Sequence, residues 1–395
     1  MESEGRYVIA VLEEAATRSG LWDWGDMDFA EPLRLFVESS RRTGALNAVG
    51  RDVLHKVVIR HLRNRLALQA YVKVHPEVRV AKVRRPVFIT GLPRTGTTLL
   101  HNLMAVDAST RVLRFWEALR PFPPGGVGGR SEEALVAEAE VWLQRLYSLT
   151  PYFRAIHAST ATGPEECDAL FQNSFASQHF DDMFRADDYS HLLSGASLDS
   201  AYRHYRLQLR ALQLQALQLH AGEGGHRRWV LKSPGHLGYL AALFQTFPDA
   251  TVVVCHRDPE EAVASYASLV MNVRQPYSDD VTPEAVGAHA LRRCSLAMQR
   301  ALATRDAVGE QAFVDVSFPS MVEDPIAVVR GIYERIDHPF SDEAEAAMRQ
   351  WLVDNPRNQH GAHRYELSQF GLTSEAVNEG LAPYGERFKA ELAPR

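Results

Sequence analysis

The segment from Pro86 to Val106 constrains the fold of this chain more than any other feature of the sequence. Pro86–Thr90 is a short apolar run without alternation, which is typical of a strand buried on both faces of a parallel sheet. The glycine-containing stretch Gly91–Thr98 follows at once, and Leu99–Val106 then reads as an apolar helix. A loop in this position offers free N–H groups and a positive helix end to an anion. The segment therefore predicts a phosphate-binding loop.

Further apolar runs of the same kind predict more strands, namely 228–231, 251–255 and 312–316. Helical stretches separate them, at 238–247, 259–273 and about 283–304. Strands that alternate with helices of this length predict an α/β fold, a P-loop-type parallel sheet flanked by helices.

The rest of the chain divides by character around this core. Residues 1–80 show amphipathic helical spacing and predict a helical N-terminal extension. The core is expected over 84–340, with a helical insertion at 120–225 that begins in a Pro/Gly-rich loop. Residues 341–395 are expected to form C-terminal helices.

Composition excludes several classes of protein. The 395 residues are 46% hydrophobic and carry a net charge of −6, which argues against non-specific nucleic-acid binding. No apolar run approaches the roughly 18 residues of a membrane span, and the acidic N-terminus does not resemble a secretory signal. The three cysteines lie far apart, which excludes a disulfide scaffold and a zinc cage and predicts a reducing, cytoplasmic location.

The phosphate loop differs from the ordinary P-loop at one decisive position. Thr97 stands where that motif has its lysine, and Arg94 is the cation inside the loop. The missing lysine disfavours ATP or GTP hydrolysis, because that lysine holds the β- and γ-phosphates. A donor with a single 5′-phosphate group and no obligatory metal fits better.

Two more strand ends carry polar groups. Arg257 follows one strand, with Asp258-Pro259 suited to start a helix and Ser265 eight residues beyond Arg257. An Arg fork and a hydroxyl in this arrangement suit a second phosphate. Lys232 follows another strand, and His236 four residues later is either a base or a structural residue.

Together the three motifs resemble the sulfotransferases that use 3′-phosphoadenosine 5′-phosphosulfate (PAPS), in particular a bacterial cytosolic group distantly related to the tyrosylprotein enzymes. The resemblance covers about 84–335 and implies in-line sulfuryl transfer without a metal. It gives Arg94 and Lys232 the role of stabilising charge at the sulfuryl group. The donor-binding residues that it implies are Arg94, Thr95, Gly96, Thr97, Thr98, Arg257 and Ser265.

The general base has more than one candidate. Glu117 ends a strand-like run over 110–116, and relatives with a glutamate base carry it at a similar distance from the loop. His236 is the alternative, and the pair Glu165-Glu166 is a third. We favour Glu117 slightly over His236.

Two looser matches concern residues that are expected to cover the donor. Ser317-Phe318 resembles a segment near the adenine in relatives. The stretch 359–361 falls where some relatives clamp the 3′-phosphate, and the C-terminal region is accordingly expected to cover the donor.

The acceptor is expected to be a small molecule with a hydroxyl, apolar or aromatic in character. Insertion 120–225 is expected to form its pocket or lid, since specificity resides in such loops. Its aromatic neighbourhood includes Trp116, Phe122, Tyr152, Phe153, Phe171 and Phe175. The sequence leaves homo-oligomerisation open.

Two rival functions remain at this stage. One is a metabolite kinase with an aberrant loop, for which Asp315 would be the magnesium ligand. The other is a nucleotide-binding module without catalysis, which turnover with PAPS would distinguish from an enzyme.

Overall fold

A computed structural model describes residues 2–122, 131–149, 159–219, 227–356 and 365–392. Its centre is a five-stranded sheet in the order β2-β3-β1-β4-β5, in which every pairing is parallel. The strands are β1 (Val87–Gly91), β2 (Thr110–Arg111), β3 (Arg228–Lys232), β4 (Thr251–His256) and β5 (Phe313–Ser317). The predicted α/β class with a parallel sheet is confirmed.

Strand β1 occupies the middle of the sheet because it is buried on both faces. Val87 pairs with Val230 of β3 on one side and with Thr251 of β4 on the other. The chain leaves β1 toward the β2 edge and later returns past it to β4. The loop after β1 therefore lies where the strand order reverses, the place where open α/β sheets bind ligands.

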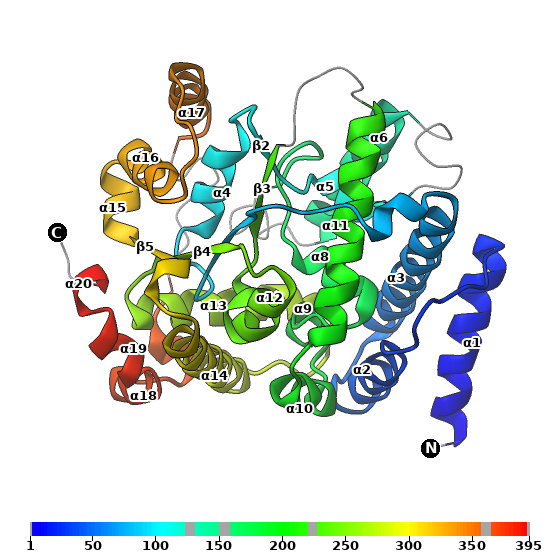
Figure 1. The fold of residues 1–395 in the computed structure, drawn as a ribbon. Coiled ribbons are helices and arrows are strands. Elements are labelled where there is room, and N and C mark those ends of the chain that lie inside the picture. The colour runs from blue at the N-terminus through cyan, green and yellow to red at the C-terminus, as the bar shows by residue number, and fades with distance from the viewer. Residues whose placement is uncertain (1, 123–130, 150–158, 220–226, 357–364, 393–395) are drawn as a thin grey trace.

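Helices cover both faces of the sheet (Figure 1). One face carries α4 (Thr97–Ala105), α15 (Phe318–Glu323), α16 (Pro325–Arg335) and α17 (Asp342–Asp354). The other carries α11 (Asp199–Leu219), η4 (Pro234–Tyr239), α12 (Leu240–Thr246), α13 (Pro259–Arg274) and α14 (Pro283–Val308).

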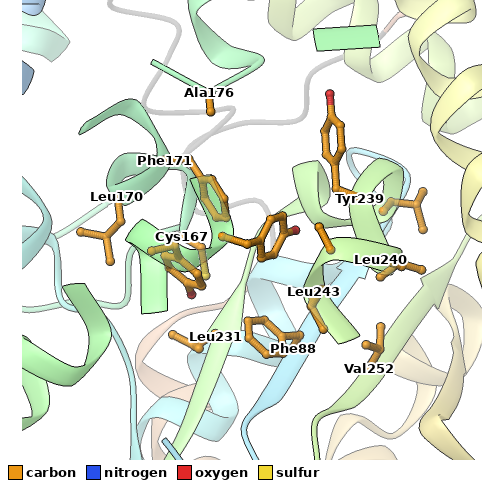
Figure 2. Packing of buried hydrophobic residues seen from close by; sticks show 14 of the residues in the cluster. Phe88, Cys167, Leu170, Phe171, Ala176, Leu231, Tyr239, Leu240, Leu243 and Val252 are labelled. Atoms are coloured by element: carbon orange, nitrogen blue, oxygen red, sulfur yellow. The ribbon is translucent and has the colours of Figure 1, made fainter. Parts of the chain in front are cut away.

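Packing on the second face is dense because neighbouring strands present large side chains at one level. Figure 2 shows Phe88, Leu231 and Val252, from three strands, beneath Leu240 and Leu243 of α12. All five side chains are at most 2% exposed. This layer fixes the strand ends on which the polar groups of the site stand.

The insertion and the C-terminal region are mostly helical where the structure describes them. The insertion contains α6 (Glu132–Leu149), α8 (Asp168–Phe171), η3 (Gln172–Ser174), α9 (His179–Phe184), α10 (Asp187–Gly195) and α11, and the short helix α5 (Phe115–Leu119) directly precedes it. The C-terminal region contains η7 (Leu367–Phe370), α18 (Ser374–Gly380), α19 (Ala382–Arg387) and α20 (Lys389–Leu392). Short 3-10 turns η5 (Gln275–Tyr277) and η6 (Glu310–Ala312) flank α14.

The N-terminal helices pack on the insertion and share a second apolar core with it. They are α1 (Glu2–Ser19), α2 (Ala30–Thr43) and α3 (Ala48–Val74), followed by η1 (Pro76–Arg79). Phe36 of α2 stacks on Phe180 of α9 with ring centroids 4.3 Å apart. Phe175 and Tyr189 join the same cluster. The helical character expected for this region is present.

One local expectation was wrong. The run 110–116 was expected to be strand-like, but β2 ends at Arg111 and α5 begins at Phe115. The reason is a capping contact, because the Glu117 carboxylate accepts a hydrogen bond from the Arg114 N–H at 2.9 Å and so favours a helical turn. Among the described helices, none is both long and apolar enough to cross a membrane.

Candidate active site

The phosphate loop links β1 to α4 through backbone that few residues tolerate. Gly91 has φ 151°, and a Cβ there would lie 2.4 Å from the carbonyl oxygen of Cys255. Gly96 has φ 90° and directly precedes α4. Thr95 closes the turn by donating from its hydroxyl to the Leu92 carbonyl at 2.8 Å. The N-terminal N–H groups of α4 are thereby presented at the C-terminal edge of the sheet, as phosphate binding requires.

Arg94 also has a left-handed backbone, with φ 71°. Its Nε donates to the hydroxyl of Ser265 at 3.2 Å. Burial lowers the pKa of the Arg94 guanidinium, and the nearby Arg257 lowers it further. The second cation is itself paired, because an Arg257 guanidinium nitrogen lies 2.7 Å from Glu261 Oε2. An anion held beside the desolvated Arg94 guanidinium would stabilise its charge.

Arg257 stands just past β4, as its sequence position predicts. One guanidinium nitrogen donates to the Arg94 carbonyl at 2.9 Å, and the group lies 4.3 Å above the Phe318 ring. Asp258 caps α13 by accepting from the Glu261 N–H at 3.1 Å. The structure thus brings Arg94, Arg257 and Ser265 together from separate segments.

The Phe318 ring also borders the phosphate loop, since a Cβ on Gly96 would lie 3.1 Å from its Cδ2. An adenine stacks readily on an aromatic ring. The position is consistent with the expected place of Ser317-Phe318 near the adenine, which stays a prediction.

Lys232 ends β3 and faces the start of α4. Its side chain is 2% exposed, and its Nζ donates to Glu166 Oε1 at 2.5 Å and lies 3.3 Å from the Thr98 hydroxyl oxygen. The Glu166 segment is held in place by a hydrogen bond from the Cys167 N–H to the Lys232 carbonyl at 2.9 Å. An ammonium, a carboxylate and a hydroxyl therefore meet at the phosphate loop.

Glu165, which is next to this group, has a pKa above its ordinary value. Burial raises its pKa to about 7, and the charge of Glu166 adds to the rise against a hydrogen bond from the Glu166 N–H. That hydrogen bond is 2.7 Å long. Glu165 is also tied to the core through its own N–H, which donates to the Leu113 carbonyl at 2.7 Å.

Glu117, the base that we favoured from the sequence, lies in α5 and is buried, with 6% of the residue exposed. One oxygen accepts from an Arg111 guanidinium nitrogen at 2.6 Å, and the other accepts the Arg114 capping bond described above. The Arg111 guanidinium in turn lies 4.5 Å above the Trp229 ring. These contacts are of the kind that hold a helix start in place.

His236 lies in an aromatic enclosure formed by Phe88, Phe171, Tyr202 and Tyr205. Its Nδ1 is 2.7 Å from the Tyr202 hydroxyl oxygen. Burial lowers the pKa of His236 to about 3, so the ring is neutral at physiological pH. The side chain is 2% exposed.

Sequence reasoning weighed Glu166 only within an acidic pair and gave no place to Tyr384, whose hydroxyl contacts the Arg257 backbone. The adjacent carboxylates at 165 and 166 pointed to Glu166, but nothing in the sequence pointed to Tyr384. Residues 359–361, together with Tyr152 and Phe153, lie outside the described residues.

The rival magnesium ligand has other partners. Asp315 accepts from Arg305 at 2.7 and 2.6 Å and lies 2.8 Å from His256 Nε2. The hydrogen bonds with Arg305 and His256 lower the pKa of Asp315 to about 2, against the effect of burial. A carboxylate bound in this way is part of a structural ion-pair network, and the kinase alternative loses its metal ligand.

A parallel sheet with a lysine-free phosphate loop and cations at three strand ends (Arg94, Lys232 and Arg257) defines an enzyme that takes a group from a nucleotide donor. The chain belongs to the sulfotransferase family, whose model matches residues 86–342. The predicted family is confirmed, and with it the PAPS-dependent transfer of a sulfuryl group.

Two crystal structures are similar along nearly the whole chain. Sulfotransferase STF9 from Mycobacterium avium is 30% identical, with a TM-score of 0.83 over 98% of this chain and 97% of that one. Sulfotransferase STF1 from Mycobacterium tuberculosis is 29% identical, with a TM-score of 0.81 over 95% and 98%.

A relative from Mycobacterium bovis is named omega-hydroxy-beta-dihydromenaquinone-9 sulfotransferase Stf3. It is 22% identical over 310 residues, which cover 76% of this chain and 75% of that protein.

Proposed function

We propose that this sulfotransferase moves the sulfuryl group of PAPS to the hydroxyl of an apolar, lipid-like alcohol, with Glu166 as the general base. The observation that carries the proposal is the meeting of Lys232, Glu166 and Thr98 at the head of the phosphate loop. The relative named for a hydroxylated menaquinone supports the acceptor class.

The donor fits the cations of the site. The N-terminal N–H groups of α4 and Arg94 would hold the 5′-phosphosulfate, while Arg257 and Ser265 would hold the 3′-phosphate. The donor carries separate anionic groups, and the Arg257 guanidinium that would meet one of them donates to the backbone carbonyl of Arg94. The described cations and hydroxyls at the phosphate loop suit an anionic donor, and transfer is proposed to require no metal.

The reaction is an in-line displacement at sulfur. The acceptor oxygen forms a bond to sulfur while the bond from sulfur to the 5′-phosphate oxygen breaks, and the acceptor proton passes to Glu166. Lys232 and Arg94 neutralise the charge that grows on the sulfuryl and bridging oxygens. Lys232 is desolvated, so its charge acts through a low dielectric.

Three features favour Glu166 over the other candidate bases. Its carboxylate contacts Lys232, whereas the Glu117 oxygens bind Arg111 and the Arg114 N–H. His236 is enclosed by aromatic rings and bound to Tyr202. Glu166 thus combines a carboxylate with a place beside the charge-stabilising lysine.

An apolar acceptor is supported by the surroundings of α5 and α6. Phe115 and Trp116 of α5 pack with Leu135, Ala139 and Leu143 of α6 in one apolar cluster.

A cytoplasmic location is also proposed, supported by Cys167, Cys255 and Cys294, which are all buried thiols without a disulfide.

The function is tested by PAPS turnover against a panel of long-chain alcohols, hydroxylated quinones, phenols, steroids and sugars, with EDTA present. We expect transfer to the apolar alcohols. Transfer only to sugars would contradict the acceptor class, and loss of turnover on chelation would contradict metal-independent transfer.

The base is tested by the same substitution at two glutamates. Glu166→Gln should lower kcat roughly 10²–10⁴-fold with little change in donor affinity, because it keeps the shape and removes the proton acceptor. Glu117→Gln is the matched control and should retain most of the kcat of the folded enzyme. A severe Glu117→Gln with a mild Glu166→Gln would assign the base to Glu117 instead.

A further inference from the structure

The hydroxyl of Tyr384 makes an unusual pair of contacts with one residue. It accepts a hydrogen bond from the Arg257 N–H at 3.3 Å and donates to the Arg257 carbonyl at 3.2 Å. Tyr384 belongs to α19, which lies 127 residues away in the sequence. A single side chain from the C-terminal region therefore holds both backbone groups of the residue assigned to the 3′-phosphate.

Arg257 needs such a partner because of its place in the fold. It follows the last residue of β4 and precedes the cap of α13, so neither element supplies hydrogen bonds for its backbone. Tyr384 is 1% exposed, and burial raises the pKa of its hydroxyl, which therefore stays protonated and able to donate. An unpaired backbone group in this half-buried position would be costly.

Tyr384 is itself fixed from several sides. Its ring stacks on His256 with centroids 5.7 Å apart, and Phe388 covers the same histidine at 4.1 Å. His256 is anchored by the hydrogen bond to Asp315 described above. Arg387 adds contacts of 2.5 Å to Asp306 and 2.6 Å to Glu310.

The same C-terminal region also contacts the first turn of α13. The Ser374 hydroxyl donates to Glu260 Oε2 at 2.7 Å, and the Asn378 amide donates to Glu260 Oε1 at 2.9 Å. The turn that carries Arg257 is thus held from α18 and from α19.

We propose that Tyr384 is a positioning residue of the donor site, which sets the Arg257 backbone so that its guanidinium meets the 3′-phosphate. The inference rests on the proposed role of Arg257. It predicts that the Tyr384 hydroxyl matters for donors with a 3′-phosphate and not for analogues without one, because both of its hydrogen bonds go to the Arg257 backbone.

The test compares two nucleotides on the full chain by calorimetry: adenosine 3′,5′-bisphosphate and adenosine 5′-phosphate. Tyr384→Phe keeps the ring and removes the hydroxyl. We expect a loss of about five- to tenfold in affinity for the bisphosphate, since both hydrogen bonds of the hydroxyl to the Arg257 backbone are removed, and unchanged affinity for the monophosphate. In turnover assays of Tyr384→Phe, the donor KM should rise while kcat at saturating donor remains unchanged.

Tyr333→Phe is the matched control. Tyr333 is 0% exposed, and its hydroxyl donates to Asp107 at 2.8 Å in the layer on the other face of the sheet. This variant should lower the melting temperature without changing the ratio of the two affinities, which separates positioning from stability.

The outcomes are distinct. A Tyr384→Phe variant that retains the wild-type ratio overturns the proposal. So does a double variant with Arg257→Ala that loses as much as the two single variants combined, because Tyr384 would then act independently of Arg257. If the wild-type chain binds both nucleotides equally, the assignment of Arg257 to the 3′-phosphate fails instead.

Discussion

At the residue scale, the acidic pair at positions 165 and 166 shows how environment separates two identical side chains. Glu166 accepts from Lys232, while burial raises the pKa of Glu165 to about 7. Both side chains are carboxyl groups, and only their surroundings differ. Two neighbouring groups with opposed surroundings are a common sign of acid–base sites.

Glu165 gives a prediction for the pH dependence of stability. Its pKa rises on folding from the ordinary 4.5 to about 7, so the folded chain binds an extra proton between these values. Stability attached to this group is therefore complete below about pH 4.5 and is lost as pH rises through about 7. Glu165→Gln does not titrate, so we expect its melting temperature to gain on that of wild type between about pH 5 and about pH 8.

Thermal unfolding of both proteins across this range is the measurement. Glu165→Gln replaces the carboxyl group by an amide of the same size, which limits changes in packing. A melting temperature of Glu165→Gln that stays parallel to that of wild type, or falls relative to it, as pH rises would contradict the raised pKa of Glu165.

At the scale of the element, the short helix α5 decides the surroundings of Glu117. The apolar residues between 110 and 116 favour a strand, but the Glu117 carboxylate accepts a hydrogen bond from the Arg114 N–H and so favours a helix. Local hydrogen bonding of this kind outweighs the weak strand preference of a short segment. By contrast, α13 begins where Asp258-Pro259 predicts, because the cap and the fixed proline φ are local properties.

At the scale of the whole molecule, the N-terminal helices and the insertion share one aromatic core. Phe36 of α2 contacts Phe175, Phe180 and Tyr189, which all come from the insertion. The Phe36 side chain is 0% exposed. The helices of the first 80 residues therefore contribute to the shape of the insertion.

Phe36→Ala should lower the free energy of unfolding by about 3–5 kcal/mol, because it empties a packed aromatic site. Val49→Ala, in the neighbouring helix α3, is the control, since Val49 is 47% exposed. The control should change stability by less than about 0.5 kcal/mol. Urea denaturation measures both, and equal small effects would show that this cluster contributes little to the fold.

The sequence by itself determined the parts of this protein whose causes are local. Glycines at 91 and 96 are required by a positive φ, and a buried strand and an apolar helix flank them, so the phosphate loop is readable in order. The cap of α13 and the doubly buried strands follow from the same short-range rules. Arg94, Lys232, Arg257 and Ser265 could be named as candidates because each stands at a fixed distance from a strand end.

Only the tertiary structure decided which of these residues meet one another. Glu166 reaches Lys232 across 66 positions, and Tyr384 reaches Arg257 across 127. Such pairs depend on how the insertion and the C-terminal helices pack against the sheet edge. The energy of that packing is spread over many apolar contacts, and no short stretch of sequence carries it. The capping role of Glu117 and the aromatic enclosure of His236 were hidden for the same reason.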